Sequence, residues 1–242
     1  MSIVKHIPNT ITSMNLLCGV LGVICTFKGS YDTAFFFMLA AAACDFCDGL
    51  SARLLNAYSD LGKELDSLAD MVSFGVLPAL MVYKLMTGIH GESVLCYVPL
   101  LIAVFSALRL AKFNIDERQS DNFIGLATPA CAMICGSFAF YVSKDPSSVL
   151  YSWSCSRFFL PVGSVILSLL LVSEIPMFSM KFKKNIKPGT PIHKQRIGFI
   201  GVIFVSTVLT LLLGLNWSLI VLLTFVSYIV MNIGIALLFR KK

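Results

Sequence analysis

Charged side chains are scarce in this chain of 242 residues: they make up 13% of the sequence, whereas hydrophobic residues make up 57%. The mean hydropathy is +0.84. This profile is typical of a polytopic membrane protein and excludes an ordinary soluble domain. The length leaves room for about eight spans of roughly 20 residues joined by short connections. We therefore predict an all-α membrane helix bundle that forms a single integral membrane domain over residues 1–242.

The chain also lacks a disulfide framework, and it has only three histidines. Its eight cysteines are scattered through apolar segments without the spacing of a secreted disulfide protein. Cys44 and Cys47 form a CxxC pair, but neither a second CxxC nor a pair of histidines accompanies it. Packing of small side chains between helices is the favoured role of these two cysteines, with a metal or redox role as the alternative.

Long apolar runs are what the chain has instead. They predict transmembrane helices near residues 10–27, 33–54, 66–87, 94–113, 124–143, 158–178, 197–214 and 217–239. If both termini are cytoplasmic, fifteen of the 19 Lys and Arg residues lie on the cytoplasmic side and four lie outside. This positive-inside asymmetry predicts that both termini face the cytoplasm. The net charge of +6, densest in segment 181–196, is expected to face anionic lipid rather than nucleic acid.

Four aspartates interrupt the apolar sequence in the stretch DFCDGLSARLLNAYSDLGKELDSLAD. Asp45 and Asp48 are three residues apart, and Asp66 and Asp70 are four apart, so each pair lies on one face of a helix. Four carboxylates in mid-membrane would cost roughly 10–14 kcal/mol, comparable to the net stability of a domain. One or two divalent cations would offset this cost and the mutual repulsion. Oxygen ligands without histidine indicate magnesium, manganese or calcium rather than zinc.

The aspartates belong to the spaced pattern D-x2-D-G-x2-A-R-x8-G-x3-D-x3-D, which resembles the signature of the CDP-alcohol phosphotransferase family. Its fixed positions are Asp45, Asp48, Gly49, Ala52, Arg53, Gly62, Asp66 and Asp70. The resemblance implies that the first three aspartates are the principal ligands of two Mg²⁺ or Mn²⁺ ions. It implies that Asp70 completes the metal site and accepts the proton of the attacking hydroxyl. The two glycines, the alanine and the arginine would bind the CDP group.

Further stretches resemble the phosphatidylserine synthases of this family. They are PN-x2-T-x2-N-x3-G in the first predicted helix, LDSLAD followed by VSFGV-x-PA, RLAKFN, IGLATPA and SEIPMFSMKFK. The resemblance covers residues 8–182, the expected catalytic core, and leaves 197–239 as two additional helices. It implies transfer of the phosphatidyl group from CDP-diacylglycerol to the hydroxyl of L-serine, with release of CMP.

Polar residues at the predicted cytoplasmic helix ends are candidates for binding the acceptor or a phosphate: Asn9, Asn15, Arg109, Lys112 and Asn114. Arg109 can form a bidentate pair with the serine carboxylate, or it can hold the donor phosphate. Interhelical hydrogen bonding is the alternative role for the two asparagines of the first helix. Positive-inside topology is the alternative for the basic residues, and it is favoured for Lys112.

Two other functions compete with serine transfer. The signature alone is equally compatible with glycerol 3-phosphate or an inositol as the acceptor. A more distant alternative is an ion transporter, although transporters usually place their acidic groups near the membrane midplane. We expect a homodimer in a prokaryotic cell membrane, with the active site on the cytoplasmic side and no nucleic-acid partner.

Overall fold

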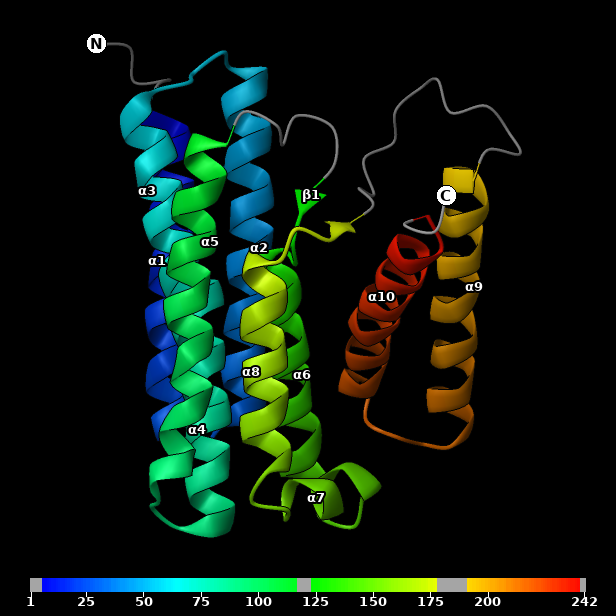
Figure 1. Ribbon diagram of the computed structural model, residues 1–242. Helices are drawn as coiled ribbons and strands as arrows, with labels where there is room; N and C mark the ends of the chain where they lie inside the picture. Colours follow the sequence, from blue (N-terminus) through cyan, green and yellow to red (C-terminus); the bar gives the residue numbers. More distant parts are fainter. Residues whose placement is uncertain (1–5, 117–122, 178–190, 240–242) are drawn as a thin grey trace.

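The computed structural model describes residues 6–116, 123–177 and 191–239, which form helices and one short pair of strands (Figure 1). The elements are α1 (His6–Phe27), α2 (Tyr31–Leu54), α3 (Asp60–Asp70), the π-helix η2 (Met71–Val76), α4 (Leu77–His90), the 3-10 helix η3 (Val94–Leu100), α5 (Leu101–Ile115), β1 (Phe123–Ile124), α6 (Thr128–Lys144), α7 (Val149–Ser154), α8 (Phe159–Val172), β2 (Pro176–Met177), α9 (Pro191–Leu212) and α10 (Ser218–Phe239). The all-α prediction is confirmed, because the antiparallel pairing of β1 with β2 is the only sheet among the described residues.

The chain is an integral membrane protein by the length and composition of its helices. Among the described residues, five helical segments are long and apolar enough to cross a membrane: His6–Phe27, Tyr31–Leu54, Asp60–His90, Val94–Ile115 and Ser218–Ala236. Two further apolar helices, Phe159–Val172 and Gly198–Leu212, are shorter. Each of the eight predicted spans overlaps a helix, but the count of eight spans stays a prediction. Most of the basic segment 181–196 lies outside the described residues.

Local sequence signals set several helix boundaries. The Ser59 side chain accepts a hydrogen bond from the Gly62 N–H at 3.0 Å and thereby caps the start of α3. The helix therefore begins several residues before the apolar span predicted to start at residue 66, since a cap and not hydrophobicity fixes this end. Helix α4 ends at His90, and the next residue, Gly91, caps it with a φ of 73° that favours glycine. Pro129 lies in the first turn of α6, where its missing N–H is tolerated.

Close helix crossings position α1 and α6. Helix α6 lies in the interior, and most of its residues are buried. A Cβ on its Gly136 would lie 2.8 Å from the ring of Phe35 in α2. A Cβ on Gly19 of α1 would overlap the Oγ of Ser73 in η2. Small residues let membrane helices approach backbone to backbone, so α1 passes directly beside the turn that follows Asp70.

The last two helices form an antiparallel hairpin (Figure 1). Its second helix, α10, packs on α6. Leu222 and Ile229 of α10 join the hydrophobic core. Trp217, just before α10, lies 5.7 Å from the ring of Phe140 at the far end of α6, measured between centroids. Its ring also contacts Phe35 of α2 at 5.7 Å. These aromatic contacts attach the hairpin to the bundle.

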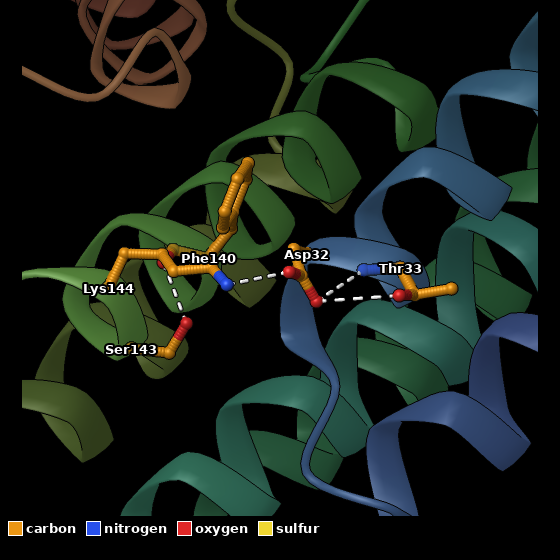
Figure 2. A network of polar contacts seen from close by, with 5 residues as sticks. All are labelled: Asp32, Thr33, Phe140, Ser143 and Lys144. Carbon is orange, nitrogen blue, oxygen red and sulfur yellow. Dashed lines mark hydrogen bonds and ion pairs between the residues drawn. The ribbon is translucent and has the colours of Figure 1, made fainter.

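An ion pair joins α2 to α6 at the same end of the bundle. The Lys144 Nζ lies 2.7 Å from Asp32 Oδ2, and the Thr33 N–H donates to Asp32 Oδ1 at 2.8 Å (Figure 2). Asp32 lies in the first turn of α2 and Lys144 in the last turn of α6, where each charge is favourable to the helix dipole. This end of the bundle is opposite to the end of α2 that carries Asp45 and Asp48.

Candidate active site

Helices α2 and α3 bring three of the four predicted metal ligands together. Asp45 and Asp48 lie near the end of α2, and Asp66 lies in α3. One carboxylate oxygen from each of the three lies within 4.8 Å of the others. The Oδ1 atom of Asp66 is buried and has no hydrogen-bond partner among the described residues. A buried, unpartnered carboxylate oxygen beside two further carboxylates fits a hard divalent cation, so this group could hold a metal ion.

Asp70 lies one helical turn beyond Asp66, outside the group of three. Its Oδ1 atom accepts a hydrogen bond from the Asn15 Nδ2 at 3.1 Å. Asn15 is fully buried in α1, and its backbone carbonyl accepts a further bond from the Ser73 hydroxyl at 3.0 Å. Asn15, predicted to contact acceptor or phosphate, therefore contacts the Asp70 carboxylate beside the group of three. The roles predicted for Asp70, as metal ligand and as base, remain predictions.

Thr12 is a site residue that the sequence interpretation did not select. Its hydroxyl oxygen lies 2.6 Å from Asp48 Oδ2, and the threonine is buried. The signal for it was present, because Thr12 lies midway between Asn9 and Asn15 in a polar stripe of three-residue spacing. The stripe faces the aspartates. The hydrogen bonds of Thr12 and Asn15 therefore join α1 to α2 and α3 and at the same time hold Asp48 and Asp70.

A cavity of about 270 Å³ opens beside the carboxylates. All four predicted CDP-binding residues line it: Gly49, Ala52, Arg53 and Gly62. Asp48 and Asp66 form part of its wall, as does Asn9 of α1. A Cβ on Gly62 would lie 3.0 Å from the Oδ1 of Asn9, so glycine keeps this wall open. Tyr58 and Lys63 also line the cavity and were not selected from the sequence.

Arg109 of α5 is the buried basic residue near the aspartates in the described part of the chain. Its side chain is 8% exposed, and its charge interacts with that of Asp70. The Nη1 donates to the Thr128 Oγ1 of α6 at 2.9 Å, and the guanidinium lies 5.5 Å from the ring centroid of Phe113. Its Nε is buried without a hydrogen-bond partner among the described residues. A desolvated guanidinium with an unused donor is a suitable partner for an anion.

The other two candidates at the end of α5 have protein partners. The Lys112 Nζ lies 3.9 Å from the Glu174 Oε1, and both side chains are largely exposed. The Asn114 Nδ2 donates to the Ser67 Oγ at 2.9 Å, and the Asn114 carbonyl accepts from the Lys63 Nζ at 3.1 Å. Asn114 therefore ties the end of α5 to α3, between Asp66 and Asp70. For Lys112, the contact with Glu174 agrees with a surface role.

Similarity to known proteins agrees with this site. Residues 5–170 match the family model described as CDP-alcohol phosphatidyltransferase, and the chain belongs to that family. Among its relatives is the CDP-diacylglycerol–serine O-phosphatidyltransferase of Bacillus subtilis (strain 168), 34% identical over 188 residues, which are 76% of this chain and 98% of the relative.

The namesake in Helicobacter pylori (strain 26695) is 34% identical over 184 residues, 74% of this chain and 75% of the relative. The archaetidylserine synthase of Methanothermobacter thermautotrophicus is 34% identical over 134 residues, 54% of this chain and 57% of the relative. The family predicted from the signature is confirmed.

Proposed function

We propose that this chain transfers the phosphatidyl group of CDP-diacylglycerol to the hydroxyl of L-serine, forming phosphatidylserine and releasing CMP. The observation that carries the proposal is the group of three carboxylates at a cavity lined by all four CDP-signature residues. The choice of serine is supported by VSFGV and RLAKFN in the sequence. It is also supported by the relatives, which are named serine phosphatidyltransferases.

The direct test is release of CMP by the purified protein from CDP-diacylglycerol, with serine, glycerol 3-phosphate and inositol supplied in turn. Serine should support turnover at least about 10-fold better than either alternative, because inositol has no anionic group for the buried guanidinium and glycerol 3-phosphate brings a larger phosphate in place of the carboxylate. Turnover with glycerol 3-phosphate or inositol and not with serine would replace the acceptor and keep the family chemistry.

The aspartates and Arg53 have separate roles in the proposed reaction. Asp45, Asp48 and Asp66 would hold one or two Mg²⁺ or Mn²⁺ ions, with Ca²⁺ as a possible occupant, and the metal supplies positive charge to the pyrophosphate. Asp70, oriented by Asn15, accepts the proton of the serine hydroxyl. The serine oxygen forms a bond to the phosphorus of the phosphatidyl group, and the bond from that phosphorus to the CMP oxygen breaks. Arg53, at the cavity, is placed to pair with a phosphate of the donor.

Arg109 is proposed to bind the serine carboxylate. A bidentate, charge-assisted pair contributes about 1.5–3 kcal/mol. Arg109→Lys keeps the positive charge but loses the planar pair of donors. We expect the KM for serine to rise roughly 10-fold or more in this variant, with the KM for CDP-diacylglycerol little changed. Separate titrations of the two substrates measure this.

Arg157→Lys is the matched control, because Arg157 is exposed and lies before α8 at the end of the bundle away from the aspartates. It should leave both KM values unchanged. If Arg109→Lys raises the KM for CDP-diacylglycerol and leaves that for serine unchanged, Arg109 holds the donor phosphate and the serine assignment is wrong.

The proposed orientation places both termini and the aspartates on the cytoplasmic side of a prokaryotic cell membrane. The fifteen-to-four division of Lys and Arg supports it. A nucleotide would then enter from the cytoplasm while the lipid tails of the donor stay in the bilayer. Residues 8–182 are proposed as the catalytic core of a single membrane domain, and 178–182 lie outside the described residues. We also propose that the protein is a homodimer.

Cysteine labelling in intact cells tests the orientation. A cysteine at Tyr58, which is 70% exposed beside the cavity, should be protected from a membrane-impermeant maleimide. A cysteine at Ser147, exposed at the opposite end, should react. Both are made in a Cys155→Ser background, because Cys155 is an exposed native thiol near Ser147. Labelling at position 58 together with protection at 147 would reverse the orientation.

A further inference from the structure

The C-terminal hairpin, α9 with α10, contributes no described residue to the aspartate group or to the lining of the cavity. The match to the family model ends at residue 170, before α9 begins. Nevertheless α10 packs on α6, the helix whose first residue, Thr128, accepts a hydrogen bond from Arg109. The hairpin therefore lies against an element of the candidate site. The side chains of α10 near Thr128 decide whether the hairpin only packs or also contributes to the reaction.

The register of α10 against α6 places Tyr228 at the level of Thr128. The two helices run antiparallel, and Trp217 contacts Phe140 at 5.7 Å near one end of the pair (Figure 1). Each helix rises about 1.5 Å per residue. Eleven residues after Trp217 is Tyr228, and eleven residues before Phe140 is Pro129, which follows Thr128. The aromatic contact at one end thus aligns Tyr228 with the start of α6.

The surroundings of Tyr228 agree with this register. At this level Thr128 accepts the hydrogen bond from Arg109, and the electrostatic surroundings of Arg109 include Tyr228 of α10 and Asp70 of α3. The Tyr228 ring is half-buried and makes an edge-on contact with Phe199 of α9, 5.9 Å between centroids. The Asn232 Nδ2 donates to the Tyr228 carbonyl at 2.7 Å. The Tyr228 ring is therefore held against α9 by Phe199, while the Asn232 bond to the Tyr228 carbonyl lies within α10.

The Arg109 guanidinium has N–H donors that a neighbouring hydrogen-bond acceptor could satisfy. A buried guanidinium carries five N–H donors in one plane. One of them is satisfied by Thr128, and the Nε has no partner among the described residues. A phenol oxygen can accept a hydrogen bond from a guanidinium without cancelling its charge, whereas a carboxylate there would neutralise it. A tyrosine next to Arg109 therefore restricts the orientation of the planar guanidinium and leaves its positive charge available to an anionic ligand.

We propose that α10 completes the acceptor side of the active site, with Tyr228 as a positioning residue that orients Arg109 toward Asp70 and the bound acceptor. The inference rests on the proposed function, because it assigns Tyr228 to the same site and the same acceptor carboxylate. It gives the last two helices a role in substrate recognition in addition to packing.

The test is Tyr228→Phe, which removes only the hydroxyl group and keeps the contact with Phe199. The proposed bond from the guanidinium to the phenol oxygen is not among the hydrogen bonds of Arg109 in the described residues; if it forms with the bound acceptor, its loss corresponds to about a 10-fold weaker interaction. We expect the KM for serine to rise about 10-fold, with kcat and the KM for CDP-diacylglycerol changed less than about 2-fold. Tyr83→Phe is the matched control, because Tyr83 lies in α4 beside Tyr97 of η3, away from the aspartates, and should change none of the three.

A double variant separates positioning through Arg109 from an independent effect. If Tyr228 acts through Arg109, Tyr228→Phe should add less than about 2-fold to the serine KM of Arg109→Lys. Full additivity of the two effects would overturn the proposal, and so would a Tyr228→Phe protein with a wild-type serine KM. Wild-type protein that turns over another acceptor but not serine would contradict the proposed function instead. The same pair of variants would then be compared through the KM of that acceptor.

Discussion

Asp70→Asn should lower turnover by about 10²–10⁴-fold while donor binding is largely retained. A general base contributes an effect of this size, because without it the attacking hydroxyl must lose its proton to water. Asp70 is placed for this role since it lies beside, and not within, the group formed by Asp45, Asp48 and Asp66. The asparagine can still contact Asn15, so the local fold is kept. Steady-state kcat and the binding of CDP-diacylglycerol are the two measurements.

Asp60→Asn provides the matched control for Asp70→Asn. Asp60 is exposed in the first turn of the same helix, and the substitution removes the same charge at the far end of α3. It should change kcat less than about 2-fold, because a single surface charge at a helix start contributes only about 0.3–1 kcal/mol to stability. A proportional loss of donor affinity and kcat in Asp70→Asn would identify Asp70 chiefly as a metal ligand.

The aspartate cluster could be predicted because two independent constraints agree. Helical spacing places Asp45 with Asp48 and Asp66 with Asp70, and the cost of burying four carboxylates calls for a cation. The signature then assigns the two pairs to one site. The structure brings three of these side chains together across two helices. Glycine, alanine and arginine at fixed offsets similarly identified the wall of the cavity.

The partners of those residues could not be predicted, since they depend on how helices cross. Thr12 reaches Asp48 because α1 packs along α2, and Asn15 reaches Asp70 because α1 also lies close to η2, where Gly19 approaches Ser73. For Lys112 the sequence favoured a topological role, and its contact with Glu174, distant in sequence, could not be predicted; a role in binding the acceptor or a phosphate stays a prediction. Nothing in the sequence near residue 228 indicates a neighbour of Arg109.

The π-helical turn after Asp70 was also outside what periodicity can predict. Asp66 and Asp70 must face the site, whereas Phe74, Leu77 and Met81 are fully buried in the core. A π-helix takes in an extra residue per turn and so rotates the faces of the helix on its two sides relative to each other. Positions 66, 70, 74, 77 and 81 would all lie on one face of an ideal α-helix, so their spacing gives no signal for the wider turn of η2.

Removal of divalent metal should lower activity by at least about 10³-fold, and Mg²⁺ or Mn²⁺ should restore it. A metal that neutralises a transferring phosphoryl group contributes several kcal/mol to the transition state, and each 1.36 kcal/mol is about tenfold in rate. The buried and unpartnered Oδ1 of Asp66 indicates that the apo site is electrostatically unfavourable. Zn²⁺ should restore activity poorly, because the cluster of Asp45, Asp48 and Asp66 contains no nitrogen or sulfur ligand.

A binding measurement separates the metal site from the rest of the reaction. Purified protein without substrates should bind Mn²⁺, as measured by the loss of the free-ion electron paramagnetic resonance signal. Asp66→Asn should weaken this binding about 10-fold or more, because it removes one ligand charge from a group of three, whereas Asp60→Asn should not. Unchanged Mn²⁺ affinity in Asp66→Asn would place the metal elsewhere. Full turnover in chelated protein would exclude a metal-dependent reaction, and the burial of Asp48 and Asp66 would then need another source of compensation.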